Sequence, residues 1–159
     1  MNHAPAIGIA ETRQRLLDAV DAIADVLVAQ TPVDEARGTL SAETVKTLED
    51  AGMFRLKLPT ALGGAEADPT TQILVIESLS HANPAAGWCA MVGSTSVGMP
   101  GAFLPQEAVE QMFPGGRIPM CAAVAMPIGR MEIVDGGYLL SGRWPFGSGV
   151  RHSEWIAAG

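Results

Sequence analysis

The 159 residues include 17 acidic and 10 basic side chains, and 48% of them are hydrophobic, enough for a buried core in a chain of this length. The lysines and arginines are scattered rather than gathered into a stripe, so nucleic acid is not an expected partner. Cys89 and Cys121 form no CxxC pair and no histidines stand at metal-ligand spacing, which argues against a metal site and favours a reducing cytoplasm.

The segment 11–116 has the pattern of an all-helical domain, preceded by a flexible arm over residues 1–10. Apolar residues recur at spacings of three and four over 11–30, and Pro32 is expected to end this first helix. Ser41 is a typical N-cap and predicts a second, short helix. Further helices are predicted to start at Asp68-Pro69 and Asn83-Pro84, each a capping residue followed by a proline. The remaining helices are predicted at 69–81, 84–97 and 105–113.

The segment 117–159 has the pattern of an incomplete β domain, with a tight hairpin predicted at Asp135-Gly136-Gly137. No βαβ alternation is present, so the predicted fold class is α+β: an N-terminal all-helical domain followed by the first antiparallel strands of a β-barrel-like middle domain. The last strand would lack a partner, and we therefore expect the chain to be part of a longer protein. Strands are predicted at 117–126, 131–134 and 138–144, and from about Glu154.

The uncharged stretch 84–106 is long enough to raise the question of a membrane span. It is broken by prolines and glycines and is rich in small and hydroxylated residues, so it does not predict a membrane helix. No secretory signal is visible at the N-terminus either. A cytoplasmic location is the expectation.

The segment 141–149 has the sequence SGRWPFGSG and follows a predicted strand. It contains two aromatic residues and then a serine with a glycine on each side. Such a turn can present backbone amides and the Ser148 hydroxyl to a flat polar ring, while Trp144 and Phe146 supply apolar surface. A strand end with core aromatics explains the same residues, and on spacing alone it is the simpler interpretation. The loop 58–64, LPTALGG, likewise fits a plain connection between helices.

Taken together, the motifs LP..LGG, DGGY and SGRW.F.SG, in this order, resemble the acyl-CoA dehydrogenase superfamily from its N-terminal helical domain into its middle β domain. The resemblance covers the chain from about Arg13 onward. In the form of its last two motifs the chain is more similar to the two-component flavin-dependent monooxygenases than to typical dehydrogenases. The family's catalytic glutamate or histidine belongs to a C-terminal helical bundle that we expect to be absent here, so no catalytic residue is assigned.

The resemblance implies a flavin, FAD or FMN, and four cofactor-binding residues. Phe146 and Ser148 match a tryptophan and a threonine that lie against the flavin in typical dehydrogenases. By this match, Phe146 would pack beside the isoalloxazine and Ser148 would hydrogen-bond near its N5. The backbone at Ala125 and Met126 would also contact the flavin, although the Thr-Glu-Pro motif of the dehydrogenases keeps only its proline here.

The 84–97 helix is similar to the one that walls the substrate cavity in the family, which implies substrate-pocket roles for Trp88 and Ser94. Core packing is the simpler interpretation for both residues. A structural role is also favoured for His152, after the serine turn, and for Glu77, on an apolar helix face.

The function implied is the N-terminal portion of a flavin-dependent oxidoreductase, more similar to the reduced-flavin monooxygenase (hydroxylase) type. Its partners would be a small-molecule substrate and a flavin reductase. One alternative is an acyl-CoA dehydrogenase that oxidises a CH–CH bond, and another is a truncated non-catalytic fragment or interaction module. Little activity is expected of the chain alone, so a complementary C-terminal chain is a further expected partner, as is a second copy in a homo-oligomer.

Overall fold

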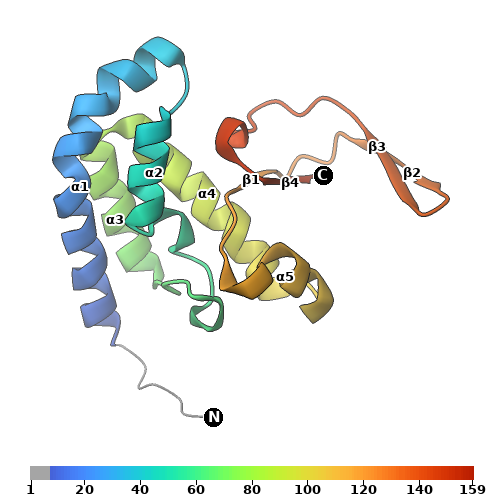
Figure 1. Cartoon of the computed structure of the whole chain (residues 1–159), viewed down its shortest axis with the longest axis horizontal. Coiled ribbons are helices and arrows are strands. Elements are labelled where there is room, and N and C mark those ends of the chain that lie inside the picture. The colour runs from blue at the N-terminus through green and yellow to red at the C-terminus, as the bar shows by residue number, and fades with distance from the viewer. Residues whose placement is uncertain (1–7) are drawn as a thin grey trace.

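The computed structural model describes residues 8–159, and over this range it places five α-helices ahead of four short strands. The helices gather at one end of the molecule and the strands extend from it (Figure 1). The expected order of a helical part followed by a β part is confirmed. The helices are α1 (Ile9–Arg37), α2 (Ala42–Asp50), α3 (Pro69–Ala82), α4 (Pro84–Phe103) and α5 (Gln106–Met112). The strands are β1 (Cys121–Val124), β2 (Arg130–Val134), β3 (Gly137–Ser141) and β4 (Trp155–Ala158).

Helix α1 is longer than predicted at both ends. It begins at Ile9, inside the expected flexible arm, whose residues 1–7 lie outside the described range. It also continues through Pro32, so the prediction that this proline ends the helix was wrong. An interior proline removes one backbone hydrogen bond at a cost of about 3 kcal/mol. Buried hydrogen bonds of Asp34 hold the turn beyond the proline, and Gly38, with φ 62°, ends the helix.

The predicted N-caps of the next three helices are confirmed. The side-chain oxygens of Ser41, Asp68 and Asn83 each accept a hydrogen bond from a backbone N–H of the first helical turn. These bonds satisfy donors that a helix start leaves free. Helix α4 runs past its predicted end, through Pro100.

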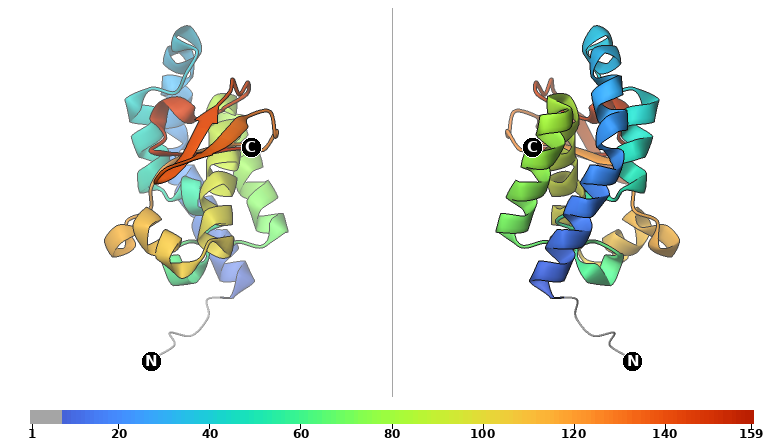
Figure 2. Two further views of the ribbon diagram at one scale, coloured as in Figure 1. Left: turned by 90° about the vertical axis from the view of Figure 1, so that its right-hand side faces the viewer. Right: turned by 90° about the vertical axis from the view of Figure 1, so that its left-hand side faces the viewer.

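Helices α1, α3 and α4 pack against one another, with α2 against α1 (Figure 2). Small residues on α4 permit close approach: a Cβ on Gly93 would lie 2.7 Å from the Phe54 ring, and one on Gly87 would collide with Ser80. The uncharged stretch of the sequence is thus a central packing helix. Among residues 8–159, no helix is long and apolar enough to cross a membrane.

The LPTALGG loop needs both of its glycines. Gly63 has φ 81°, in the left-handed region that favours glycine. Gly64 passes so close to the Leu58 carbonyl that a Cβ would collide with it. The loop therefore combines a sharp turn with a close backbone approach.

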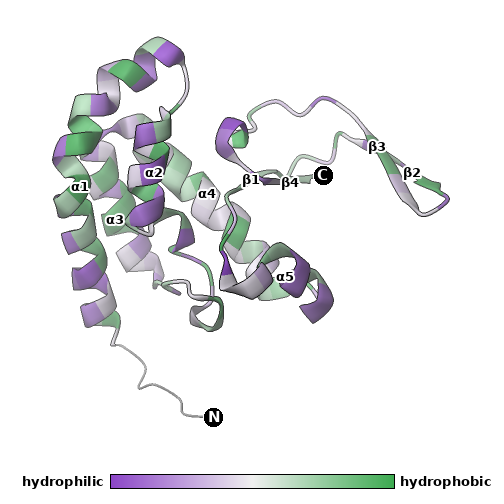
Figure 3. Cartoon of the chain, in the orientation of Figure 1, coloured by the Kyte–Doolittle hydropathy of each residue, from purple (hydrophilic) through white to green (hydrophobic). Residues whose placement is uncertain are grey.

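The strands form two separate pairs. The hairpin of β2 and β3 is antiparallel, with Val134 opposite Gly137 and Gly136 at φ 80°, as the DGG sequence predicts. The other pair differs from the prediction, because β4 has a partner and lies parallel to β1. Between β1 and β4 the chain forms the β2–β3 hairpin, and β4 then runs beside β1 in the same direction. Local sequence does not specify this path. The hairpin projects from the rest of the molecule (Figure 3). Several of its hydrophobic side chains are exposed, Ile133 among them.

Candidate functional site

The turn that carries Ser148 is tied to helix α4. The Trp88 indole Nε1–H donates a hydrogen bond of 2.9 Å to the Ser148 hydroxyl oxygen. An indole N–H can only donate, so the Ser148 hydroxyl accepts here and keeps its own proton for another acceptor. The structure thus links Trp88, which was predicted for the substrate pocket, to Ser148, which was predicted for cofactor binding.

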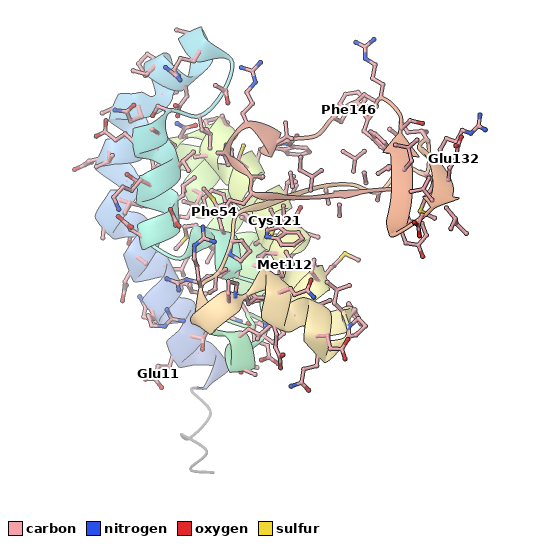
Figure 4. The ribbon with its side chains drawn as sticks, turned by 45° about the vertical axis from the view of Figure 1, so that its right-hand side comes forward. Glu11, Phe54, Met112, Cys121, Glu132 and Phe146 are labelled. Atoms are coloured by element: carbon pink, nitrogen blue, oxygen red, sulfur yellow. The ribbon has the colours of Figure 1, made fainter. Side chains whose placement is uncertain are left out.

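Phe146 is held in an unusual conformation. Its φ is 61°, in the left-handed region, which costs a residue with a Cβ roughly 1–2 kcal/mol. Its side chain is 87% exposed, so no burial in the chain offsets this strain. In Figure 4 it lies on the segment that returns from the hairpin, away from the helices. Strained residues of this kind cluster at ligand sites.

A hollow of about 440 Å³ lies beside this turn, between the start of α4 and the connection from α1 to α2. We call it the Ser148 hollow. Its wall includes Trp88, Ser148 and His152, whereas Phe146 is not part of it. The volume is in the range of small-molecule pockets, roughly 300–1,000 Å³.

His152 contributes a buried nitrogen to this region. Its Nδ1 is buried without a hydrogen-bond partner within residues 8–159, and its ring centroid lies 6.0 Å from that of Phe54. Burial lowers the pKa of His152, which favours the neutral imidazole. Such an unsatisfied atom is the kind of group that a ligand can complete. Sequence reasoning favoured a structural role for His152 and gave no sign of this nitrogen.

The predicted backbone contacts lie near the same turn. A Cβ on Gly147 would be 3.7 Å from the Val124 side chain, at the end of β1. Ala125 and Met126 follow directly and are exposed. The serine turn and this segment, distant in sequence, are therefore neighbours.

Ser94 is not brought to the Ser148 hollow. It is 1% exposed, and its hydroxyl donates to the Met91 carbonyl within α4. It lines a different hollow of about 470 Å³ between α3 and α4, which Glu77 also lines. Trp88 and Ser94 therefore do not wall one pocket in this structure.

Sequence reasoning missed Asp34, a carboxylate that is 3% exposed in the wall of the Ser148 hollow. It accepts hydrogen bonds from the Ser41 N–H at 2.6 Å, the Thr44 hydroxyl at 2.9 Å and the Asn83 amide at 3.0 Å. Asn83 also caps α4, the helix of Trp88. The carboxylate thus links the segments that frame the hollow, and no local pattern marks it.

The thiols and acids do not suggest a nucleophile or a metal. Burial raises the pKa of Cys89, which lines the Ser148 hollow, and raises the pKa of Cys121 to about 11. Both thiols are therefore protonated at neutral pH and poor nucleophiles. Within the described part of the chain, no group of three or more histidine, cysteine or acidic side chains could hold a metal ion.

In a comparison with protein families, residues 10–113 match the family described as acyl-CoA dehydrogenase, N-terminal domain. Among curated proteins, the chain is 32% identical to the flavin-dependent monooxygenase oxygenase subunit HsaA of Mycobacterium tuberculosis (strain CDC 1551 / Oshkosh), over 92% of this chain and 37% of that protein. It is 30% identical to indole-3-acetate monooxygenase of Pseudomonas putida, over 76% of this chain and 30% of that protein.

A solved structure extends the likeness to the fold. XiaF from Streptomyces sp., in complex with FADH2 and glycerol, is 26% identical with a TM-score of 0.88, over 94% of this chain and 38% of that one. The crystal structure of the HsaA monooxygenase from M. tuberculosis gives a TM-score of 0.80 at 29% identity, over 92% of this chain and 40% of that one. The chain therefore spans about a third of the length of the curated relatives that it matches.

Proposed function

Because this chain belongs to the acyl-CoA dehydrogenase family, we propose that it forms the N-terminal portion of a flavin-dependent oxidoreductase of the reduced-flavin monooxygenase type. The chain is related to flavin-dependent monooxygenase oxygenase components at about 30% identity, which favours hydroxylation over oxidation of a CH–CH bond. The observation that carries the proposal is the Trp88–Ser148 hydrogen bond beside a hollow of ligand size.

The donors of the site suit an isoalloxazine ring. Ser148 would donate its free proton to a ring nitrogen, while Trp88 holds its oxygen in place. The exposed Phe146 ring would pack against the isoalloxazine. The backbone at Ala125 and Met126, next to the serine turn, would also contact the isoalloxazine. A bound flavin would supply the redox chemistry, and these residues would orient it and keep water from one side.

The partners and domain limits follow from the same proposal. A two-component system would deliver reduced flavin from a separate flavin reductase, since one relative is named the oxygenase component of an FADH(2)-dependent resorcinol hydroxylase, from Rhizobium sp. (strain MTP-10005). The small-molecule substrate would be hydroxylated. Residues 11–116 would form the helical domain, and 117–159 would form part of the middle domain.

Substitution of Ser148 tests the site directly. Ser148→Ala removes one hydrogen-bond donor, so we expect flavin affinity to fall by about 0.5–1.5 kcal/mol, or roughly 2-fold to 13-fold, in a fluorescence titration. Ser141→Ala, which alters an exposed hydroxyl on β3, is the matched control and should bind as the parent does. Phe146→Ala should also weaken binding without affecting the fold, because its ring is exposed. Unchanged affinity in both site variants would contradict the assignment.

The type of chemistry is tested separately. With supplied reduced flavin and oxygen, a protein that contains this chain should form a hydroxylated product if it is a monooxygenase. If it is instead an acyl-CoA dehydrogenase, an acyl-CoA should bleach the oxidised flavin without oxygen. If it is an interaction module, neither reaction occurs and a complementary chain should co-purify with it.

A further inference from the structure

The segment 147–152 is attached to the helical part near both of its ends. Near its start, the Ser148 hydroxyl accepts the hydrogen bond from Trp88 of α4. At its end, the His152 ring lies against Phe54, with 6.0 Å between the ring centroids. The Phe54 ring in turn packs on a glycine of α4. Both attachments of the segment therefore lead to the same helix.

Hydrogen bonds close the end of this segment on itself. The His152 N–H donates to the Gly149 carbonyl at 3.1 Å, and the Ser153 hydroxyl donates to the same carbonyl at 2.9 Å. Gly149 has φ 82° and folds the chain back, so that a Cβ on it would lie 3.3 Å from the His152 Nε2. Because the turn is closed in this way, the position of His152 fixes the position of Ser148.

The hydrogen bond between Trp88 and Ser148 needs a second attachment of this kind. Trp88 is 55% exposed, so water competes for its indole N–H and the bond contributes little by itself. The pairing of β4 with β1 holds the chain only from Glu154 onward, beyond the segment. The half-buried His152 ring supplies an apolar contact within the segment itself.

The His152 ring packs there as a neutral group. Its buried Nδ1 has no hydrogen-bond partner in the described part of the chain, so packing rather than a side-chain hydrogen bond from this atom holds it. Burial lowers its pKa. A protonated ring would carry its charge into an apolar contact, which favours release of the ring into water.

The charged groups around His152 are balanced. His152 borders the Ser148 hollow and a neighbouring hollow of about 540 Å³ against the end of α1 and α2. Acidic and basic side chains line the two hollows in equal number, so they give no net preference for the imidazolium. These side chains are Asp34, Glu35, Glu49, Arg37, Lys46 and Arg151. The thiols of Cys89 on α4 and Cys121 on β1 are protonated, and Arg55, beside Phe54, lies against Gly52.

We propose that His152 is a positioning residue: its neutral ring, packed on Phe54, holds the segment 147–152 against α4 and keeps Ser148 at Trp88. The inference rests on the proposed function for the ligand, since a flavin is what the Ser148 hydroxyl would then meet. The attached segment favours the unprotonated ring, so uptake of a proton favours the detached segment. The contact between Ser148 and Trp88 is therefore lost as the solution becomes acidic.

The NMR resonance of the Trp88 indole N–H reports on this contact in the purified chain. Ser148→Ala removes the acceptor and gives the position of the resonance for the free indole. At neutral pH, His152→Ala should move the resonance most of the way to that position, whereas His152→Phe keeps a ring on Phe54 and should stay near the parent position. His81→Gln, at an exposed histidine in the last turn of α3, is the control and should have no effect. A parent-like spectrum of His152→Ala, or a His152→Phe spectrum that matches it when it is shifted, overturns the inference.

The pH dependence is a readout that a merely structural residue would not change. Between about pH 7.5 and about pH 5, the parent resonance should move toward the Ser148→Ala position, with a midpoint below the ordinary histidine pKa of 6.5. His152→Phe cannot take up this proton and should show no such movement, while His81→Gln should titrate as the parent does. A parent resonance that stays in place until circular dichroism shows unfolding overturns the inference without any variant.

Titration with FMN separates this inference from the proposed function. If His152 acts through Ser148, then His152→Ala should weaken FMN binding by no more than Ser148→Ala does, and it should add no further loss in the double variant. A further loss in the double variant overturns the inference, because His152 would then act on the ligand or the fold independently of Ser148. If the parent binds no FMN, the proposed function fails, while the Trp88 resonance still decides on His152.

Discussion

Removal of the Asp34 carboxylate should destabilise the helical part strongly. In Asp34→Ala the Ser41 N–H loses its only partner within the described residues, which costs about 1–3 kcal/mol for a buried donor. Thr44 keeps its contact with the Ser41 hydroxyl, and Asn83 keeps its bond to the Leu27 carbonyl. Thr44 can turn its hydroxyl proton from Asp34 to this neutral acceptor, whereas Asn83 loses one of its two hydrogen bonds, and each change costs about 0.5–1 kcal/mol. The expected loss is therefore about 2–5 kcal/mol of unfolding free energy.

Urea unfolding followed by circular dichroism measures this loss. The control is Asp25→Ala, because Asp25 is an exposed carboxylate on the same helix, and it should change the free energy by no more than about 0.5 kcal/mol. The reasoning is refuted if Asp34→Ala loses less than about 1 kcal/mol, since relief of burying the charge would then outweigh the lost hydrogen bonds. It is equally refuted if the two variants lose the same amount.

Two further substitutions test the loop and the buried imidazole. Gly64→Ala should lower the unfolding free energy by about 1–3 kcal/mol or more in the same urea assay, because its Cβ would collide with the Leu58 carbonyl; a stability equal to that of the parent would contradict this packing. His152 has a folded-state pKa below its ordinary value of 6.5, so the unfolded chain binds more protons and stability should fall as pH drops through about 6.5. His152→Gln should flatten this part of the urea-midpoint profile between about pH 7.5 and about pH 5.5, and an unaltered slope would show that His152 is not its source.

Much of the secondary structure could be predicted because its signals are local. The caps at Ser41, Asp68 and Asn83 act on backbone donors of the adjacent turn, so a few residues suffice to specify each helix start. The hairpin at Gly136 is similar, since its positive φ is a property of one residue. The order of the motifs in turn indicated the family, which the match over residues 10–113 confirms.

The errors occurred where distant contacts outweighed a local signal. Pro32 favours a helix end, but the buried hydrogen bonds of Asp34 keep the following turn helical. The parallel partner of β4 is another example, because strand pairing depends on the path of the whole segment between two strands.

The sequence by itself determined the helix starts, the hairpin turn and the residue types of the candidate site. Only the tertiary structure decided which of them meet. It brings Trp88 to Ser148 across 60 residues, places Ser94 in another hollow and buries the Nδ1 of His152. The physical reason is range: capping and turn preferences act within a few residues, whereas a binding site depends on contacts that exist only after the helices have packed.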